Sequence, residues 1–428
     1  MKLKYLSTAM VLATLPATGA FAAALDRSGQ SMSAFFQPGN YFEAGLSVLD
    51  ADVSGTTKAN YPNAALPLLS NTSVGEMADS YQFAHAALKL QLADQLSFGL
   101  IYDQPFGAKA TYSTDTAKLP AALPGAAAAL QGQGAFHNGT QGTSAEVETQ
   151  NLSMILGFQP NKNLNFYAGP VYQTVKGNIQ LRGTAYGGSA TFGGYNADIK
   201  ETGDIGWLAG AAYQIPEIAL KASVTYRSEI KHSTDAKESF SSLGLFAGLN
   251  AIPAKETDIT TPQSVNLDLQ TGIMADTVAF ANVRWVNWKD FAVRPYKFGV
   301  ASTQAAVVAS TGKKDGFDLV AYTDDQWSVT TGVGRKLNEH WAGNVSVGWD
   351  SGAGNPVTTL GPTEGYWNVG LGIQYSPAPN YFIAGGVKYF WLGDAKAQAA
   401  SQFDTPNYVA EFEDNNAIAY GLKLGYRF

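Results

Sequence analysis

The sequence predicts an all-β fold: a transmembrane antiparallel β-barrel of about 14 strands, with a short N-terminal plug and long extracellular loops that carry short helices. The chain is only 15% charged and contains 45 Gly, 21 Tyr and 22 Phe, yet it has no apolar run long enough for a spanning helix. Its apolar residues instead alternate with small or polar ones, as in strands between lipid and water. A secreted two-sheet β protein is the alternative fold.

The C-terminal segment shows this alternation most clearly. Small or basic residues separate six apolar ones, namely Ile418, Tyr420, Leu422, Leu424, Tyr426 and the terminal Phe428. A terminal aromatic residue after such a run resembles the C-terminal signature of outer-membrane barrels. We therefore expect Phe428 to be read by the barrel-assembly machinery and the protein to lie in the outer membrane of a Gram-negative cell.

Similar alternation predicts the remaining strands. The predicted strands span residues 41–50, 80–92, 96–104, 146–158, 164–176, 204–215, 218–232, 264–274, 277–288, 326–336, 341–350, 365–376, 381–393 and 416–428. Six short links between them alternate with seven long ones. An even strand number with both ends in the periplasm requires this arrangement. Aromatic residues at predicted strand ends, such as Trp341 and Trp367, indicate interfacial girdles.

The N-terminus predicts export. Lys2 and Lys4 precede an apolar stretch that ends before the small-residue site Ala20-Phe21-Ala22, which is typical of a cleaved secretory signal over residues 1–22. The next segment, 23–40, has no clean alternation but carries Phe35, Phe36 and Pro38. We expect this segment to fold into the barrel as a plug, and residues 41–428 to form the barrel itself.

Composition excludes several function classes. The absence of Cys and the presence of four scattered His leave little material for a metal site, so we expect neither metal nor cofactor. A formal net charge of −7 argues against nucleic acid as a partner. An outer-membrane hydrolase would need a converging His group, but His232 and Ser233 are adjacent on a strand and point to opposite faces. We therefore expect no enzymatic activity.

Two outer loops are unusually apolar for segments that face water. One covers residues 119–130, and the other, 240–252, includes Leu243, Phe246 and Leu249 at roughly helical spacing. Apolar surface at the barrel mouth indicates binding of a hydrophobic molecule, although the same residues would also suit a lid that packs on itself. Charges expected to face the lumen are scattered, as in Lys388, Arg284 and Glu229, and do not form the continuous ladder of a wide porin.

Three further segments carry a family resemblance. They are Leu220 to Lys231 with Tyr226-Arg227-Ser228-Glu229, the run Arg284-Trp285-Val286-Asn287-Trp288-Lys289-Asp290-Phe291, and the tract from Trp327 through Trp349-Asp350 to Trp367. With these segments the chain resembles the long-chain fatty-acid and hydrocarbon transporters of Gram-negative outer membranes (FadL/TodX, OMPP1 type). One departure is a short pre-barrel segment with Gln37-Pro38-Gly39 where the family has a longer plug with Asn-Pro-Ala.

The resemblance implies a monomeric barrel surrounded by outer-membrane lipid and lipopolysaccharide, with passive transport and sideways exit through the wall. It places Arg182 and Arg294 near basic residues that meet a carboxylate, with Lys176 as the alternative to Arg182. Phe291 and the apolar loop residues would contact the tail. The expected function is uptake of long-chain fatty acids. The alternatives are an aromatic-hydrocarbon importer, a general porin and a structural or adhesin barrel.

Overall fold

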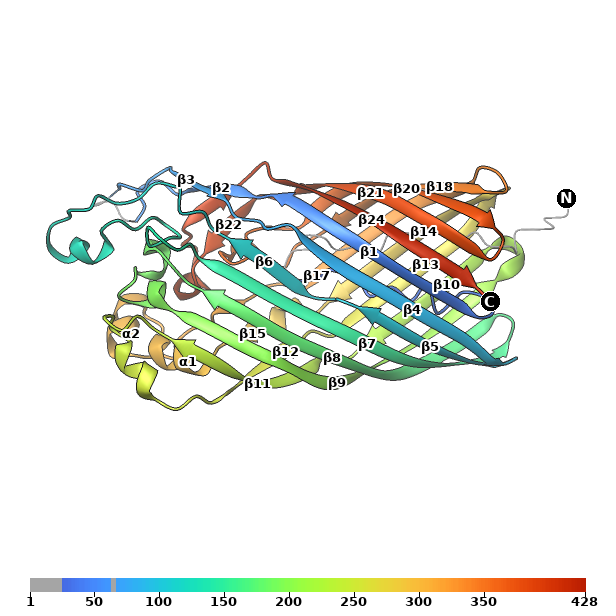
Figure 1. Ribbon diagram of the computed structural model, residues 1–428, viewed down its shortest axis with the longest axis horizontal. Coiled ribbons are helices and arrows are strands. Elements are labelled where there is room, and N and C mark those ends of the chain that lie inside the picture. The colour runs from blue at the N-terminus through green and yellow to red at the C-terminus, as the bar shows by residue number, and fades with distance from the viewer. Residues whose placement is uncertain (1–24, 63–66) are drawn as a thin grey trace.

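The computed structural model describes residues 25–62 and 67–428, which form a closed fourteen-stranded antiparallel barrel (Figure 1). Its strands are β1 (Tyr41–Asp52), β4 (Tyr81–Ala93), β5 (Leu96–Asp103), β7 (Ser144–Asn161), β8 (Leu164–Gln180), β9 (Asn196–Ile215), β10 (Leu220–Arg227), β13 (Ser264–Met274), β14 (Thr277–Val286), β17 (Gln326–Lys336), β18 (Trp341–Asp350), β20 (Tyr366–Ala378), β21 (Tyr381–Leu392) and β24 (Asn416–Arg427). Pairing of β1 with β24 closes the barrel. The predicted signal peptide, 1–22, lies outside the described residues.

The long connections carry smaller elements. Three strands prolong barrel strands: β6 (Gly107–Thr111), β11 (Ile230–Ser239) and β12 (Glu256–Thr261). Two further sheets hold β2 (Ser54–Thr57), β3 (Ser73–Glu76), β19 (Val357–Thr358), β22 (Ala395–Gln398) and β23 (Ala410–Phe412), and β15 (Ala292–Val293) with β16 (Val320–Ala321). The helices are α1 (Tyr296–Ser302) and α2 (Ala305–Thr311), and the 3-10 turns are η1 (Gly125–Leu130), η2 (Thr184–Tyr186), η3 (Phe192–Gly194), η4 (Pro216–Ile218), η5 (Ala247–Ala251), η6 (Trp288–Asp290) and η7 (Ala400–Gln402).

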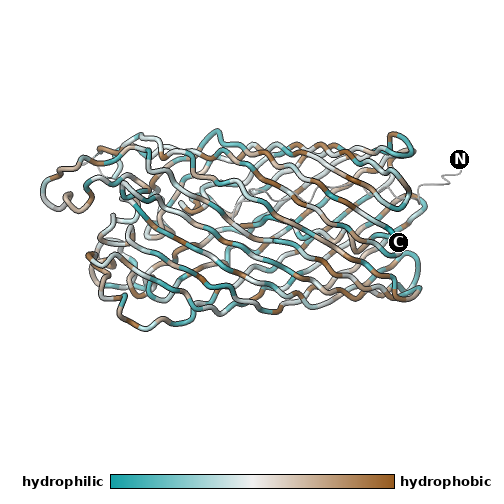
Figure 2. The backbone as a smooth tube through the Cα atoms, viewed as in Figure 1, coloured by the Kyte–Doolittle hydropathy of each residue, from teal (hydrophilic) through white to brown (hydrophobic). Residues whose placement is uncertain are grey.

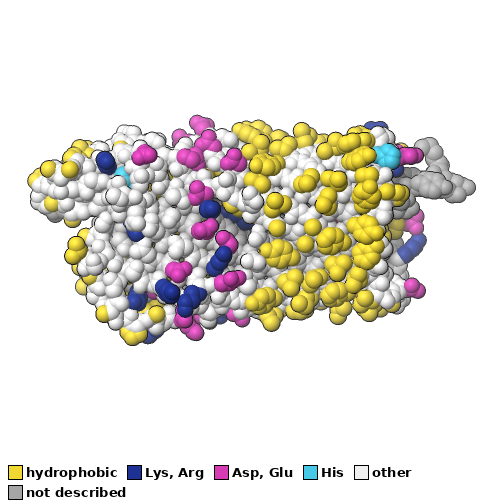
Figure 3. Space-filling view, in the orientation of Figure 1, with side chains coloured by type: hydrophobic (Ala, Val, Ile, Leu, Met, Phe, Trp, Pro, Cys, Tyr) yellow, Lys and Arg dark blue, Asp and Glu magenta, His cyan; other side chains and the backbone are white. Residues whose placement is uncertain are grey.

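An apolar belt surrounds one part of the barrel. On β24, Ile418, Leu422 and Leu424 are exposed on the outside, while Ala417, Ala419 and Lys423 are buried inside. The alternating teal and brown of the strands in Figure 2 follows this pattern, and Figure 3 shows the resulting apolar band towards the end that carries the short turns and the C-terminus. The predicted lipid-facing surface is therefore present.

Tryptophans mark one edge of this belt. Trp349, Trp367 and Trp391 are register partners across β18, β20 and β21, and all three side chains are exposed on the outside. Amphipathic rings in such a row are typical of an interfacial girdle. None of these three rings closes the lumen.

Several strands extend beyond the belt on the long-loop side. β9 begins at Asn196, whereas the alternation predicted a start at residue 204. The outer faces of these extensions carry ion pairs, such as Lys176 with Glu148 at 2.9 Å and Lys231 with Asp258 at 2.7 Å, and charged side chains border the apolar band in Figure 3. A strand with water on its outer face needs no apolar residues on that face. The sequence pattern therefore underestimates strand length there.

The predicted strand 218–232 is interrupted. β10 ends at Arg227 and β11 begins at Ile230, and the two residues between them shift the alternation. Glu229, expected to face the lumen, is consequently exposed, while Ile230 is buried.

The α-helices of the outer loops lie in a different loop from the two loops that were expected to carry them. The segments 119–130 and 240–252 form only the short 3-10 turns η1 and η5, whereas both α-helices lie in the loop 289–325. Glu238 fixes the start of α1, because its carboxylate accepts hydrogen bonds from the backbone N–H of Lys297 at 2.7 Å and of Phe298 at 2.8 Å. That long-range contact has no local sequence signal.

Candidate functional site

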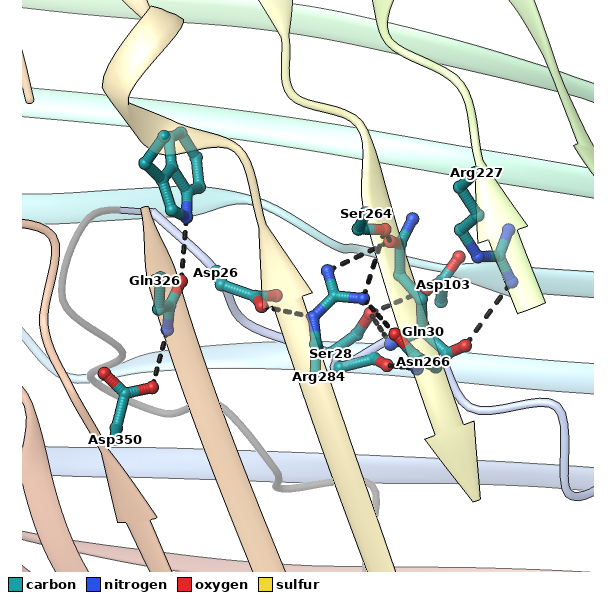
Figure 4. Close-up of polar contacts among 12 residues, drawn as sticks. Asp26, Ser28, Gln30, Asp103, Arg227, Ser264, Asn266, Arg284, Gln326 and Asp350 are labelled. Carbon is teal, nitrogen blue, oxygen red and sulfur yellow. Dashed lines mark hydrogen bonds and ion pairs between the residues drawn. The ribbon is translucent and has the colours of Figure 1, made fainter. Parts of the chain in front are cut away.

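Residues 25–40 lie inside the barrel, and an arginine of the barrel wall holds them there. Arg284 on β14 donates from Nε to Asp26 Oδ2 at 2.6 Å and from NH2 to Gln30 Oε1 at 3.0 Å (Figure 4). Its third nitrogen reaches Asn266 Oδ1 at 2.7 Å. Arg284 and Asp26 are both nearly fully buried. The buried guanidinium and the buried carboxylate therefore compensate each other's charge.

Two more polar contacts fix the same segment. Ser28 donates its hydroxyl to Asp103 Oδ2 at 2.6 Å, and Arg227 NH2 donates to the carbonyl of Gln30 at 3.4 Å. Asp103, Arg227 and Arg284 come from three different strands, so the segment bridges opposite parts of the wall (Figure 4). We call residues 25–40 the plug.

An aromatic contact completes the plug. The Phe35 ring lies 5.6 Å from that of Tyr167 on β8, and the Phe36 ring lies 5.4 Å from it. Glycine makes room for Phe35, because a Cβ at Gly99 would lie 2.5 Å from Phe35 Cδ2, and one at Gly157 would lie 2.7 Å from its Cζ. The prediction that Phe35 and Phe36 tuck into the barrel agrees with this arrangement. Pro38 lines a cavity on the short-turn side of the plug, which is described below.

The barrel wall is interrupted where the plug meets it. The ladder between β4 and β5 ends at the pair Ala86–Tyr102, while the bulge from Gln104 to Phe106 leads into β6. Pro105 in this bulge has no N–H to donate to a ladder. Plug backbone takes the place of the missing strand: Arg27 N donates to Pro105 O at 2.6 Å and Gly107 N to Leu25 O at 2.8 Å.

An apolar cavity, the upper chamber, lies on the long-loop side of the plug and has a volume of about 80 Å³. Trp288 forms its aromatic wall with Phe106, Phe291 and Tyr322, at ring distances of 5.4, 5.2 and 5.3 Å. Leu25 and Arg27 of the plug close one side. An apolar cavity that accommodates benzene measures roughly 150 Å³, so cargo enters only when part of this lining moves.

A loop of residues 357–365 covers the upper chamber. Leu360, Pro362 and Thr363 line the chamber directly. Beside them, burial raises the pKa of the Glu364 carboxyl to about 7, and nearby Asp350 and Asp324 raise it further against hydrogen bonds from Gly354 and Ala353. The protonated form is thus favoured in the closed loop.

The closed loop is expected to loosen as the pH rises. A carboxyl whose folded pKa lies above its ordinary value stabilises the fold fully at low pH, and that stabilisation is lost as the pH rises through about 7. Hydrogen exchange of residues 357–365, corrected for intrinsic rates, should therefore be faster at pH 8 than at pH 5. Glu364→Gln should remove most of the difference, and an unchanged difference in that variant would assign the effect to another group.

A second and larger cavity, the lower cavity, lies on the other side of the plug with a volume of about 720 Å³. It reaches the short turns, where Asp94, Gln159 and Pro216 line it. Phe36 and Pro38 form part of its plug side. The plug therefore separates a small apolar chamber from a wider cavity whose lining mixes polar and apolar side chains.

The residues predicted to bind ligand are distributed unevenly. Phe291 lines the upper chamber. Arg182 is buried outside both cavities, where it donates to neutral oxygens that include Tyr195 O at 3.0 Å and Asn196 Oδ1 at 2.7 Å. Arg294 is partly exposed and pairs with Asp318 at 2.6 Å.

The apolar loop residues differ from one another. Phe246 and Leu249 are buried in a loop core with Phe192 and Phe298, whereas Leu243 is 96% exposed. The alternative interpretation, in which this loop packs on itself as a lid, accounts for the burial of Phe246 and Leu249. Leu243 is left at the surface of the barrel mouth.

Sequence reasoning missed the residue pair that anchors the plug and the central residues of the upper chamber. Arg27 and Asp26 carry no motif, and Trp288 was noted only as part of the family resemblance. Arg284 and Lys388 were expected to face the lumen, which their burial confirms. A charge within the pre-barrel segment was the one available signal for a plug that pairs with the wall.

Other kinds of site receive no support. In the described part of the chain, no three His, Asp or Glu side chains are placed to hold a metal ion. His232 lies inside, with Nε2 2.9 Å from Gln173 Oε1. No helix among the described residues is long and apolar enough to cross a membrane.

Comparisons with solved structures show the fold. A FadL homologue of Pseudomonas aeruginosa superposes with a TM-score of 0.67 at 15% identity, over 96% of each chain. The toluene transporter TodX of Pseudomonas putida gives 0.59 at 14% identity, covering 96% of this chain and 97% of TodX. The toluene transporter TbuX of Ralstonia pickettii gives 0.56 at 13% identity, covering 96% and 98%.

Sequence comparison gives the family. No match was found among curated protein sequences. The family model described as "Outer membrane protein transport protein (OMPP1/FadL/TodX)" matches residues 19–428, nearly the whole chain. The plugged and closed barrel with its apolar belt agrees with that match. The chain therefore belongs to the OMPP1/FadL/TodX family of outer-membrane transport proteins, as a channel for hydrophobic compounds.

Proposed function

We propose that this channel takes up long-chain fatty acids by passive diffusion. The observation that carries this choice is a guanidinium in the lining of the apolar chamber: Arg27 of the plug is only 4% exposed and contributes to the chamber beside Leu25. Lys109 and Lys176 also line the chamber, but each pairs with a glutamate on the barrel exterior, whereas the Arg27 guanidinium stays inside and lies over the Tyr81 ring, 4.6 Å from its centroid. A buried cation beside an aromatic wall suits a carboxylate with a long apolar tail.

The route follows from the same contacts. The tail packs against Phe291 and Trp288, and the carboxylate meets Arg27 as the plug shifts. Because plug backbone fills the interruption between β4 and β6, movement of the plug opens a gap in the wall at the same time. Cargo then leaves sideways into the membrane without an energy source.

Uptake of radiolabelled oleate and toluene tests the cargo class. The channel is expressed in a Gram-negative host that lacks its own fatty-acid channel, and wild type is expected to raise oleate uptake. Arg27→Met should raise the oleate concentration for half-maximal uptake at least about tenfold, since a charge-assisted hydrogen bond contributes about 1.5–3 kcal/mol. Toluene uptake should not change in that variant. Lys162→Met removes an exposed cation and serves as the control.

Phe291→Ala should lower the affinity for both compounds, because it removes aromatic surface from the chamber without changing its charge. Raised toluene uptake with no oleate uptake in wild type would instead support an aromatic-hydrocarbon importer. The four aromatic rings of the chamber favour that second candidate.

The earlier assignment of Arg294 to the head group stays a prediction. If Arg294→Ala leaves oleate binding unaltered in detergent while Arg27→Met weakens it, the carboxylate contact belongs to the plug. The reverse result restores Arg294. The proposed roles of Arg182 and Leu243 are tested by the same binding measurement with Arg182→Gln and Leu243→Ser.

A further inference from the structure

Lys388 on β21 is a buried cation for which the described residues provide no anionic partner. It is 5% exposed and lines the lower cavity. Among residues 25–62 and 67–428, no carboxylate lies within ion-pair distance of its ammonium and no hydrogen bond to it is found. A buried charge without compensation is strongly unfavourable. Such a charge is relieved either by loss of its proton or by an anion that enters the cavity from outside the chain.

The other cations of the lower cavity are already engaged. Lys423 lies 3.4 Å from Glu43, and Lys89 donates to Gln37 O of the plug at 2.6 Å. Lys221 lies over the Phe36 ring, 5.4 Å from its centroid. These contacts hold the wall and plug together, which leaves Lys388 as the cation able to receive a new anion.

The surrounding wall presents Lys388 to the cavity. A Cβ at Gly370 of β20 would lie 3.1 Å from Lys388 Cγ and 2.6 Å from Ser346 Oγ, so the missing side chain gives the lysine stem a path across the strand. Neutral Asn344 and Ser346 line the cavity on the adjacent β18. Three acids of the cavity have other partners: Glu43 contacts Tyr41 at 2.6 Å, Asp268 contacts Asn282 at 2.8 Å, and Asp103 contacts Ser28 at 2.6 Å. The fourth, Asp94, lies at the short turns.

Apolar surface faces this wall across the same cavity. Phe36 and Pro38 of the plug line it, and Phe280 on β14 lines it from the wall. We propose that the lower cavity is a second binding site, in which Lys388 receives the carboxylate of an amphipathic acid while its acyl chain lies against Phe36 and Phe280. The choice of ligand rests on the proposed fatty-acid cargo, but the site lies on the opposite side of the plug from the upper chamber.

A single introduced cysteine can probe this site, because the chain has no cysteine of its own. Ser346→Cys places the thiol in the lower cavity next to Lys388. The purified full-length protein in neutral detergent is treated with methanethiosulfonates that carry either a sulfonate or a trimethylammonium group. The sulfonate should react faster. Adding Lys388→Met should lower the ratio of the two rates about tenfold, since it removes one unit charge near the thiol in a low-dielectric site.

Protection of this thiol from labelling then identifies the chemical class of ligand that the site binds. Laurate should slow labelling of the thiol, and dodecanol should not; Lys388→Met should abolish the protection, whereas Lys388→Arg should retain it. Glu339→Cys on an exposed short turn is the control thiol, with no protection expected. A rate ratio unaffected by Lys388→Met, or equal protection by laurate and dodecanol, overturns the proposal. Protection by inorganic phosphate but not by laurate overturns the assignment to an acyl carboxylate.

The readout does not depend on transport. Oleate uptake without laurate protection would reject the lower site and leave the proposed function standing. Laurate protection without oleate uptake would reject the proposed function and leave the lower site standing. Heat-modifiable migration in gels checks that each variant forms a folded barrel.

Discussion

Deleting residues 25–36 is expected to convert a nearly closed channel into an open pore, with single-channel conductance in planar bilayers rising several-fold. The deleted segment is the shared wall of the two cavities: Leu25 and Arg27 line the upper chamber, while Phe35 and Phe36 line the lower cavity. Without it the chambers of about 80 and 720 Å³ join into one lumen. The strand pairings that close the barrel, including that of β1 with β24, involve no plug residue.

Removing residues 119–130 from an outer loop is the matched control, because it deletes the same length of chain outside both cavities. That variant should keep the conductance of wild type. A plug deletion that folds, as judged by heat-modifiable migration, but conducts like wild type would contradict the role of residues 25–36 as the barrier. Swelling of liposomes in sugars should follow the same order.

Arg284→Met is expected to release the plug without deleting it. The substitution leaves Asp26 as a buried carboxylate without its partner, and breaking a buried pair in this way costs about 3–5 kcal/mol. The plug can avoid that cost by leaving the wall. Limited trypsin digestion at Arg27, read by mass spectrometry, should be slow in wild type, where this residue is buried, and at least about tenfold faster in Arg284→Met.

A double variant separates the charge from the packing. Asp26→Asn with Arg284→Met removes both charges and should restore much of the resistance to trypsin, since replacing a whole buried pair is often nearly neutral. If the double variant is cleaved as fast as the single one, the lost hydrogen bonds to Gln30 and Asn266 are responsible. If neither variant is cleaved faster than wild type, Phe35 and the backbone contacts at Pro105 are sufficient to hold the plug.

The barrel was predictable because its lipid belt imposes a local pattern. The strand at residues 416–428 was expected from alternation alone, and the structure pairs it over its whole length with β1. The same rule failed where lipid no longer contacts the wall. β9 begins eight residues earlier than expected at Asn196, because the outer face there is charged, and Glu229 faces outward because two residues between β10 and β11 shift the alternation.

The ligand-binding residues were harder to predict from the sequence than the barrel. Phe291 was expected to contact the tail on family resemblance, and it lines the upper chamber. Arg182 and Arg294 were expected to meet a head group, but neutral acceptors surround the first and Asp318 pairs with the second. Arg27 was passed over, because nothing in its neighbours shows that residues 25–28 pair with a bulge some eighty positions away.

The sequence alone therefore predicted the barrel, its strand order, a plug segment and an apolar cargo, since each prediction rests on local periodicity or composition. The partners of the buried charges depended on the tertiary structure. Asp26 meets Arg284 across 258 positions of chain. Among the residues that the structure describes, Lys388 has no acidic partner, because Gly370 and Ser346 lie beside it instead. Such contacts arise only when the sheet closes, because closure brings distant strands around one lumen and decides which charges that lumen leaves without a partner.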